Sequence, residues 1–262
     1  MKKKLAVILT IIMAVSMLAA CGGKDKEKEF VVGFDASFPP FGYKDEAGEY
    51  VGFDLDLAEE VCKRNDWTLK KQPIEWDSKD MEINSGTIDC IWNGFTINGR
   101  EDDYTWTKPY INNKQVIVTM KDANITSFAD LAGKIVETQT DSSALHALNE
   151  DQKALKDSFA KLTEVPEYNT AFMDLESGAC EAIALDIGVA YHQVNTRGAD
   201  KFTILDEEIS SEQYGIGFKK GNDELRDQVQ KTLDEMAEDG TLLKIAEKYE
   251  DSGIPGALAL GK

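Results

Sequence analysis

The sequence predicts an α/β fold built from two similar units. Short apolar runs typical of buried strands alternate with segments whose apolar residues recur at helical spacing, and this alternation predicts an open sheet covered by helices. The alternation begins at Phe30, pauses after a strand-like run at 116–119 and then restarts. The chain of 262 residues is long enough for two units of about a hundred residues each.

Each unit is predicted from turn residues, helix caps and apolar spacing. In the first unit we expect a strand at 30–34, a hairpin turn at 45–49, a helix at 54–65 capped by Asp54, a strand at 68–72, a helix at 77–84 and a buried strand from 88. In the second we expect a strand at 116–119, helices at 127–133 and after 143, strands at 134–137, 179–185, 201–205 and 214–218, and helices at 169–176, after 186, 222–240 and 242–249.

One stretch, residues 88–100, reads as a buried strand that ends in polar residues and then an arginine. Gly94 allows a backbone to approach a ligand closely, because it has no Cβ. The Thr96 hydroxyl and the Arg100 guanidinium both suit a carboxylate. An anion site is therefore one interpretation, and a strand, a turn and a surface arginine is an equal alternative from these residues alone.

Polar and aromatic residues follow several predicted strands, where open α/β sheets collect their ligands. In the first unit these positions are 35–38, Trp76 and 93–96. In the second, Ser142 and Ser143 precede a helix, where they could receive an anion or serve as a plain N-cap. Asp186 also follows a strand, and capping of the next helix would explain it equally well.

Composition excludes several classes of function. The net charge of −19 opposes binding to nucleic acid and electrostatic docking on anionic lipid. With two histidines, His146 and His192, a multi-histidine metal site is excluded. Three cysteines of the body lie in apolar surroundings and are expected to be buried free thiols, with a single disulfide left open: Cys62, Cys90 and Cys180.

The N-terminus reads as a leader. Three lysines precede an apolar run from Leu5 to Leu18, the pattern of a secretory signal peptide over residues 1–20. The following Leu18-Ala19-Ala20-Cys21 resembles the bacterial lipobox, which implies cleavage before Cys21 and diacylation of its sulfur. Residues 21–29 are then a lipidated cysteine and polar tether, and the body is expected outside the cytoplasmic membrane, anchored to its outer face.

The body resembles the extracytoplasmic substrate-binding proteins of bacterial amino-acid ABC importers. Four pieces carry the resemblance: Gly33-Phe34-Asp35…Pro40-Phe41, Gly52 to Ala58, Ile88-Asp89…Thr96-Ile97…Arg100, and Ala237 to Thr241 before Tyr249. The family's fold is the two-lobed periplasmic-binding-protein fold, in which each lobe is an open mixed sheet flanked by helices and two crossing strands join the lobes. The resemblance implies that residues 30–112 and 213–262 form lobe 1 and that residues 113–212 form lobe 2.

The resemblance also implies roles for site residues. Arg100 matches the position that holds the α-carboxylate of an amino acid, with help from Gly94, Thr96 and Ser142. Asp186 matches the acidic residue that receives the α-ammonium group. Phe38 and, with less support, Trp76 match positions whose aromatic rings enclose the ligand side chain. Asp35 and Asn93 match positions that contact the end of that side chain. The implied ligand set is completed by Phe95, Gln139 and Ser143.

The implied function is to bind a free polar or cationic amino acid between two closing lobes and to deliver it to the permease and ATPase subunits of an ABC importer. We expect a monomer without catalytic activity, cofactor or metal. Which amino acid binds stays open, because Asp35 suits a cationic side chain or an amide, and a pocket with aromatic walls is compatible with both and with cystine. Two alternatives also stay open: an enzyme like cyclohexadienyl dehydratase on the same scaffold, and a free-standing amino-acid sensor.

Overall fold

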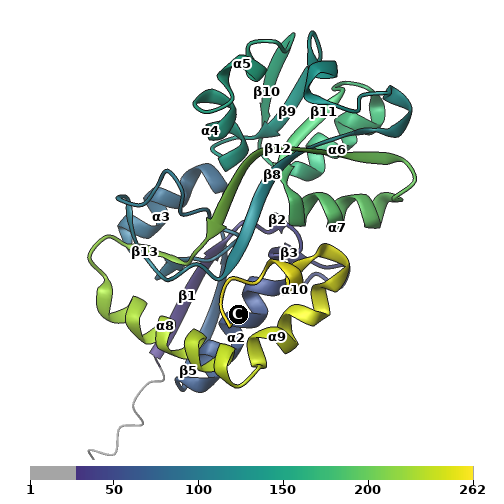
Figure 1. The fold of residues 1–262 in the computed structure, drawn as a ribbon. Coiled ribbons are helices and arrows are strands. Elements are labelled where there is room, and N and C mark those ends of the chain that lie inside the picture. Colours follow the sequence, from purple (N-terminus) through teal and green to yellow (C-terminus); the bar gives the residue numbers. More distant parts are fainter. Residues whose placement is uncertain (1–27, 262) are drawn as a thin grey trace, which may run out of the picture.

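The structure, a computed structural model, describes residues 28–261 as two lobes, each built around a five-stranded sheet (Figure 1). We call the lobe that contains the first strand lobe 1 and the other lobe 2. The predicted two-lobed α/β fold is confirmed. The predicted leader and Cys21 lie outside the described residues. Within residues 28–261 no helix has the length and apolar character that crossing a membrane requires.

The sheet of lobe 1 places two parallel neighbours beside its first strand. In spatial order its strands are β5 (Trp67–Pro73), β1 (Lys28–Phe34), β6 (Cys90–Ile91), β13 (Gly217–Lys219) and β7 (Tyr104–Trp106). A small separate sheet contains β2 (Ser37–Phe38), β3 (Gly42–Lys44) and β4 (Tyr50–Val51). The helical segments of this lobe are α2 (Phe53–Arg64), η1 (Trp76–Ser78), α3 (Lys79–Ser85), α8 (Asp223–Glu238), α9 (Thr241–Ala246), η4 (Glu247–Ser252) and α10 (Ile254–Ala257).

The sheet of lobe 2 repeats the arrangement, with parallel strands on one side and antiparallel strands on the other. In spatial order its strands are β10 (Lys161–Val165), β9 (Ile135–Gln139), β11 (Ala182–Asp186), β8 (Ile111–Met120) and β12 (Phe202–Tyr214). Its helical segments are η2 (Lys121–Ala123), η3 (Phe128–Leu131), α4 (Ser143–Asn149), α5 (Lys153–Lys156), α6 (Tyr168–Ser177) and α7 (Ile187–Arg197).

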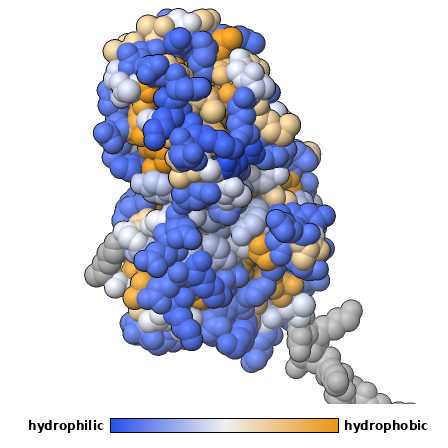
Figure 2. Space-filling view, turned by 90° about the vertical axis from the view of Figure 1, so that its right-hand side faces the viewer, coloured by the Kyte–Doolittle hydropathy of each residue, from blue (hydrophilic) through white to orange (hydrophobic). Residues whose placement is uncertain are grey.

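Strands β8 and β12 run from one lobe into the other (Figure 1). They pair along their length, and the predicted crossing positions face each other in the pairs Asn113–Glu212 and Asn112–Gln213. Where the strands enter lobe 1, Tyr214 bridges to Thr96. The exact residues at which one lobe ends and the other begins stay a prediction. The space-filling view shows a constriction between the two bodies and a largely hydrophilic face (Figure 2).

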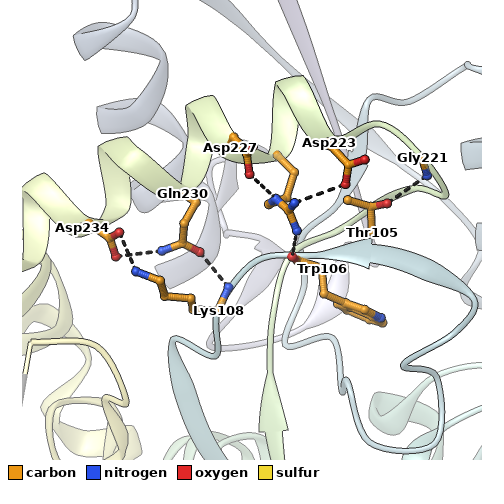
Figure 3. A network of polar contacts seen from close by, with 9 residues as sticks. Thr105, Trp106, Lys108, Gly221, Asp223, Asp227, Gln230 and Asp234 are labelled. Carbon is orange, nitrogen blue, oxygen red and sulfur yellow. Dashed lines mark hydrogen bonds and ion pairs between the residues drawn. The ribbon is translucent and has the colours of Figure 1, made fainter.

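A polar network joins α8 to β7 and the residues after it (Figure 3). The Arg226 guanidinium donates to the Trp106 carbonyl at 2.7 Å, and the Lys108 backbone N–H donates to the Gln230 side chain at 2.7 Å. The Trp106 indole N–H in turn donates to the carbonyl of Arg100 at 2.9 Å. Helix α8 therefore supports the turn that carries Arg100.

Two boundary predictions near the N-terminus of the body are wrong. The first strand begins at Lys28 rather than Phe30, because Lys28 and Glu29 already pair with Trp67 and Thr68 of β5. Asp54 is not the cap of α2, whose N-cap is Gly52. Its carboxylate lies in the first turn and is fully buried, where it accepts hydrogen bonds from a distant part of the chain.

In the second half, the strands predicted at 201–205 and 214–218 are both present with other bounds: the first is the start of the longer β12, which continues to Tyr214, and the second begins later, as β13. Exposed acidic residues at 206–208 and shifts of register near Glu208 interrupt the alternation that marks a strand. Strands β7 and β10 were not predicted. The prediction that Cys62, Cys90 and Cys180 are buried free thiols is confirmed.

Candidate ligand-binding site

The predicted site residues meet because they follow the strands at the centre of each sheet. Strand β1 lies between β5 and β6 and is parallel to both, so Asp35, Trp76 and Asn93 reach the same edge. In lobe 2, β9 and β11 are parallel neighbours, which brings Gln139 and Asp186 to the corresponding edge. The two edges face each other across a cleft between the lobes.

A cavity of about 20 Å³ lies between the lobes, and all the residues that line it are among those predicted from the sequence. They are Phe38, Trp76, Asn93, Gly94, Thr96, Gln139, Ser142, Ser143 and Asp186. The cavity has room for about one water molecule and is too small for an amino acid. Most of the residues that line it are polar, and a polar metabolite could enter only if the lobes move apart. That these residues bind a ligand stays a prediction.

Three predicted residues lie outside the cavity lining. Arg100 borders a hollow that shares Ser142 and Ser143 with the cavity, and Asp35 borders another that shares Trp76. Phe95 faces away and is fully buried, with its ring 4.8 Å from that of Trp106. Its prediction as a contact residue is not supported, because alternation along the chain turns Phe95 into the core behind Gly94 and Thr96.

Arg100 carries a positive charge that no described carboxylate neutralises. Its guanidinium donates to the Thr96 carbonyl at 3.3 Å, to the Ser143 hydroxyl at 3.1 Å and to the Asp141 carbonyl at 3.2 Å. All three acceptors are neutral, and no described Asp or Glu forms an ion pair with it. We call Arg100, Asp141 and Ser143 the cationic end of the site. An anionic group of a ligand would complete it.

Asp141 also receives two other groups of lobe 1. The Lys79 ammonium, 2% exposed, forms an ion pair with its carboxylate, and the Trp76 indole N–H donates to its carbonyl at 3.3 Å. Asp141 has a left-handed backbone conformation with φ +56°, which Asp adopts more readily than most residues. Lys79 and Asp141 were not predicted as site residues, and only their contact between distant elements identifies them.

Asp186 does not cap the following helix, so the capping explanation is wrong. Although it occupies the N-cap position of α7, its side chain makes no capping hydrogen bond. Its carboxylate instead accepts from Asn113 at 2.8 Å, from Gln115 at 2.7 Å and from the Tyr214 hydroxyl. Burial, followed by repulsion from Glu212, raises the pKa of Asp186. Among the described residues no Lys, Arg or His forms an ion pair with it.

Glu212 lies beside Asp186 and was not predicted as a site residue. Its carboxylate accepts from the Thr96 hydroxyl at 2.9 Å, from Asn113 at 2.7 Å and from Gln115 at 2.8 Å. We call Asp186 and Glu212, with Asn113, Gln115 and Tyr214, the acidic end of the site. A sequence signal exists: the side chains at 113, 115, 212 and 214 alternate with exposed or less buried neighbours on two predicted crossing segments.

The backbone of Gly94 is held in place by Asp54, the residue that the sequence predicted to cap a helix. Its N–H donates to the Asp54 carboxylate at 2.6 Å, so it is already engaged and not free for a ligand carboxylate. Asp54 also accepts from the Tyr110 hydroxyl at 2.8 Å. With φ +56°, and with a Cβ that would lie 3.0 Å from the rings of Phe38 and Tyr214, position 94 requires glycine.

Asp35 and Asn93, the residues predicted to contact the side chain of a ligand, are both buried. Asn93 is 1% exposed, and neither polar atom of its amide has a partner in the described part of the chain. Asp35 accepts from Ser37 N–H and from the Gln139 amide, both at 2.7 Å. Burial raises the pKa of Asp35 to about 6, and repulsion from Glu167 contributes. The Asn93 amide thus offers the cavity a hydrogen-bond donor and an acceptor that have no partner among the described residues.

The two serines differ in what they do. The Ser142 hydroxyl accepts from the N–H of Leu145 at 3.1 Å, so it is a helix cap, as the simpler interpretation holds. The Ser143 hydroxyl accepts from Arg100 across the cleft. Phe38, 6% exposed, packs with its ring 5.8 Å from that of Phe41 and 6.0 Å from that of Tyr168.

Comparison with known proteins agrees with this architecture. The family model of the bacterial extracellular solute-binding proteins, family 3, matches residues 30–252. The L-cystine-binding protein TcyA of Bacillus subtilis is 30% identical over 267 residues, covering 94% of this chain and 97% of that protein.

Two solved structures are similar. One is a substrate-binding protein of an ABC uptake transporter from Streptococcus pneumoniae with bound histidine, with a TM-score of 0.82, 29% identity, and coverage of 84% of this chain and 92% of that one. The other is the ancestral amino acid-binding protein AncCDT-1, described as a precursor of cyclohexadienyl dehydratase, with a TM-score of 0.77, 29% identity and coverage of 84% and 95%.

Proposed function

The chain belongs to the bacterial extracellular solute-binding proteins, family 3, and on that premise we propose that it binds a free α-amino acid between its lobes and delivers it to an ABC importer. The observation that carries the proposal is the separation of charge across the cavity. Arg100 at one end has no anionic partner among residues 28–261, and the Asp186–Glu212 pair at the other has no cationic partner there. A zwitterion supplies both missing charges.

Arg100 is then the residue that holds the α-carboxylate, and Asp186 the residue that receives the α-ammonium group. Because the two belong to different lobes, a bound amino acid connects the lobes and favours the closed arrangement. Thr96 and Gly94 act chiefly by shaping the site, since the Thr96 hydroxyl and the Gly94 N–H both have protein partners. Asn93, Asp35 and Gln139 contact the side chain of the ligand.

The ligand is a polar or cationic amino acid. The hollow beside Asp35 is also bordered by Glu75, Glu82 and Glu167, which attract a distal positive charge. The unpaired amide of Asn93 offers a donor and an acceptor to a polar side chain. The related TcyA is a cystine-binding protein, and the similar structure from Streptococcus pneumoniae contains histidine; both ligands are polar amino acids.

A ligand screen tests the proposal. The purified protein is heated with each of the twenty amino acids, ornithine and cystine, and its unfolding temperature is recorded. A micromolar ligand at millimolar concentration stabilises the fold by about 4 kcal/mol, a shift of several degrees. We expect one or a few polar or cationic amino acids to give this shift. If none does, the proposed function is wrong.

The enzyme alternative has less support. The similarity to AncCDT-1 concerns a protein described as amino acid-binding. A dehydratase needs a proton donor or acceptor directed at its substrate, and the titratable group on the cavity wall, Asp186, is already held by three donors. Incubation with prephenate or arogenate decides between the two, and turnover would favour the enzyme. A sensor would bind the same ligand, so genes for a permease and an ATPase beside this one would favour transport.

The leader and lipobox support attachment to the outer face of the cytoplasmic membrane. In this proposal Cys21 becomes the lipidated N-terminus, and the body acts as a monomer tethered near the permease. Fractionation of cells expressing the whole chain tests the anchor. The wild type should sediment with membranes, whereas Cys21→Ser should be released or retain its leader. Equal membrane attachment of both forms after removal of the leader would contradict a lipid anchor at Cys21.

A further inference from the structure

The crossing strands direct two carboxylates at the same pair of amide donors. The Asn113 amide nitrogen lies 2.8 Å from Asp186 Oδ1 and 2.7 Å from Glu212 Oε1. The Gln115 amide nitrogen lies 2.7 Å and 2.8 Å from the same two oxygens. Two carboxylates that share both donors lie close together, so placing a negative charge on both costs more free energy than placing one charge on the pair.

No cation in the described part of the chain balances this pair. Asp186 is 4% exposed and Glu212 7% exposed, and neither forms an ion pair. The groups that hydrogen-bond to them are uncharged: the Thr96 hydroxyl, the two amides and the hydroxyl of Tyr214 on β12, with Tyr168 of α6 near Asp186. Lys114 and Glu208 border a hollow with Glu212, but they form an ion pair with each other. Burial raises the pKa of both tyrosines above the ordinary value, so neither supplies or removes charge. Two full negative charges here would be strongly unfavourable.

A second observation points to a ligand beside the pair. Asp186 lines the same cavity as Asn93, whose fully buried amide has no partner for its nitrogen or its oxygen among the described residues. The Gln115 amide oxygen, at 0% exposure, is also unpaired there. Buried polar atoms are rarely left without a partner, so the cavity is built to receive polar groups.

We propose that Asp186 and Glu212 carry one proton between them in the ligand-free protein and release it when the ammonium group of an amino acid binds beside Asp186. This inference rests on the proposed function and deepens it. Before binding, the pair holds one proton and a net charge of −1. After binding, both carboxylates are ionised and the ammonium adds +1, so the buried charge is unchanged while one proton leaves to the solvent.

Glu212 is a positioning residue in this scheme, because it reaches the site through Thr96 and Asp186. It also borders a separate hollow, together with Lys114, Ser211 and Glu208 on the outer side of the crossing strands. A proton can therefore leave by way of Glu212 without passing the bound ligand. The pair makes the binding of a cationic ammonium group depend on pH, whereas a lone ionised Asp would not.

Calorimetric titration tests the proposal. The full chain is titrated at about pH 6 with the amino acid that stabilises it most, in two buffers with different enthalpies of ionisation. We expect the wild type to release close to one proton per ligand. Glu212→Gln keeps the acceptor oxygen and removes one ionisable group, so proton release should fall well below that of the wild type, with burial of Asp186 alone accounting for what remains. Glu208→Gln is the matched control on the same strand, exposed and paired with Lys114, and should behave as the wild type.

The wild type alone provides a second measurement, in case Glu212→Gln does not fold. Its affinity should rise about tenfold per pH unit below the apparent pKa of the pair and become constant above it. An affinity that is independent of pH, or equal proton release by Glu212→Gln and the wild type, would overturn the inference and leave the proposed function standing. Failure of every amino acid to bind at any pH would overturn both.

Discussion

At the cationic end of the site, Arg100 of lobe 1 reaches across the cleft to Asp141 and Ser143 of lobe 2. At the acidic end, Asp186 and Glu212 are held by side chains of β8 and β12, the strands that join the lobes. The first set of contacts exists only while the lobes are together, whereas much of the second lies on the hinge itself. The acidic end is therefore preformed, and the cationic end is completed by closure.

This difference suggests a division of labour. The hinge holds excess negative charge that a ligand ammonium group can approach from an open cleft. The cationic end then closes around the carboxylate, and Lys79 adds an ion pair between the lobes. Binding energy at the second end is thus coupled to movement, as expected for a protein that signals occupancy by its shape.

Removing the cation should have the largest effect. In Arg100→Ala the ligand carboxylate loses its charged partner, and truncating one side of such a pair typically costs about 2–5 kcal/mol. Affinity should fall at least ~30-fold. Calorimetry measures it, with Lys231→Ala, an exposed lysine on α8, as the control that should leave affinity unchanged. Unchanged affinity in Arg100→Ala would contradict the assignment of the cationic end.

Asp186→Asn tests the acidic end and should change affinity and stability in opposite directions. Loss of the negative charge should weaken amino-acid binding by roughly 30–100-fold. The ligand-free protein should become more stable at neutral pH, because a buried carboxyl with a raised pKa opposes folding once it ionises.

The pH dependence of stability follows from the raised pKa values of buried carboxyl groups. Burial raises the pKa of Asp35 to about 6 and that of Asp54 to about 7, and it raises the pKa of Asp186 too. Between about pH 4 and pH 7 the unfolded chain has lost these protons while the native state keeps them, so their contribution to stability falls as pH rises. Urea unfolding of Asp186→Asn and the wild type across this range measures the difference, which should grow with pH. A difference that shrinks with pH would contradict the account.

Lys79→Met should have a smaller effect on affinity and act through closure. Lys79 does not line the cavity, but it pairs with Asp141 across the cleft. Loss of this pair should disfavour the closed state and weaken binding by about 3–10-fold. Asp141→Asn keeps the backbone carbonyl that Trp76 and Arg100 contact. If the pair is responsible, the double variant should be no weaker than either single variant.

Gly94→Ala should have the smallest effect on affinity and is best measured as a loss of thermal stability. Its Cβ would meet the rings of Phe38 and Tyr214 at 3.0 Å in a left-handed conformation. Gly86→Ala is a matched control, since Gly86 also has positive φ but a Cβ at that position would meet no other side chain within 4 Å. Backbone strain alone costs about 1–2 kcal/mol, so Gly94→Ala should be the more destabilised of the two. Equal losses would show that the rings tolerate the methyl group.

Much of the fold and cavity wall could be predicted from the sequence, because strands, caps and glycine stops are local patterns. Residues at strand ends such as Asn93, Gln139 and Asp186 follow from the rule that open sheets bind ligands at one edge. The same locality explains the errors. Asp54 looks like a helix cap when only its neighbours are considered, whereas its partner Gly94 lies 40 residues away.

Other functional residues depend on contacts that local patterns do not encode. Glu212 is recognised as part of the candidate site only by its position beside Asp186, Asn113 and Gln115. These residues approach it only after β8 and β12 pair. Lys79 reads as an ordinary helical lysine until the second lobe brings Asp141 to it. Phe95 shows the opposite case, since it lies in a motif of site residues yet faces the core.

The most direct test of the account compares two ligands in two proteins. The wild type and Arg100→Ala are titrated with the best amino acid and with its α-carboxamide, which keeps the ammonium group and lacks the carboxylate. The account predicts that the wild type prefers the amino acid at least ~30-fold and that Arg100→Ala nearly loses this preference. Retention of the full preference by Arg100→Ala would show that the carboxylate is bound elsewhere and would contradict the central claim.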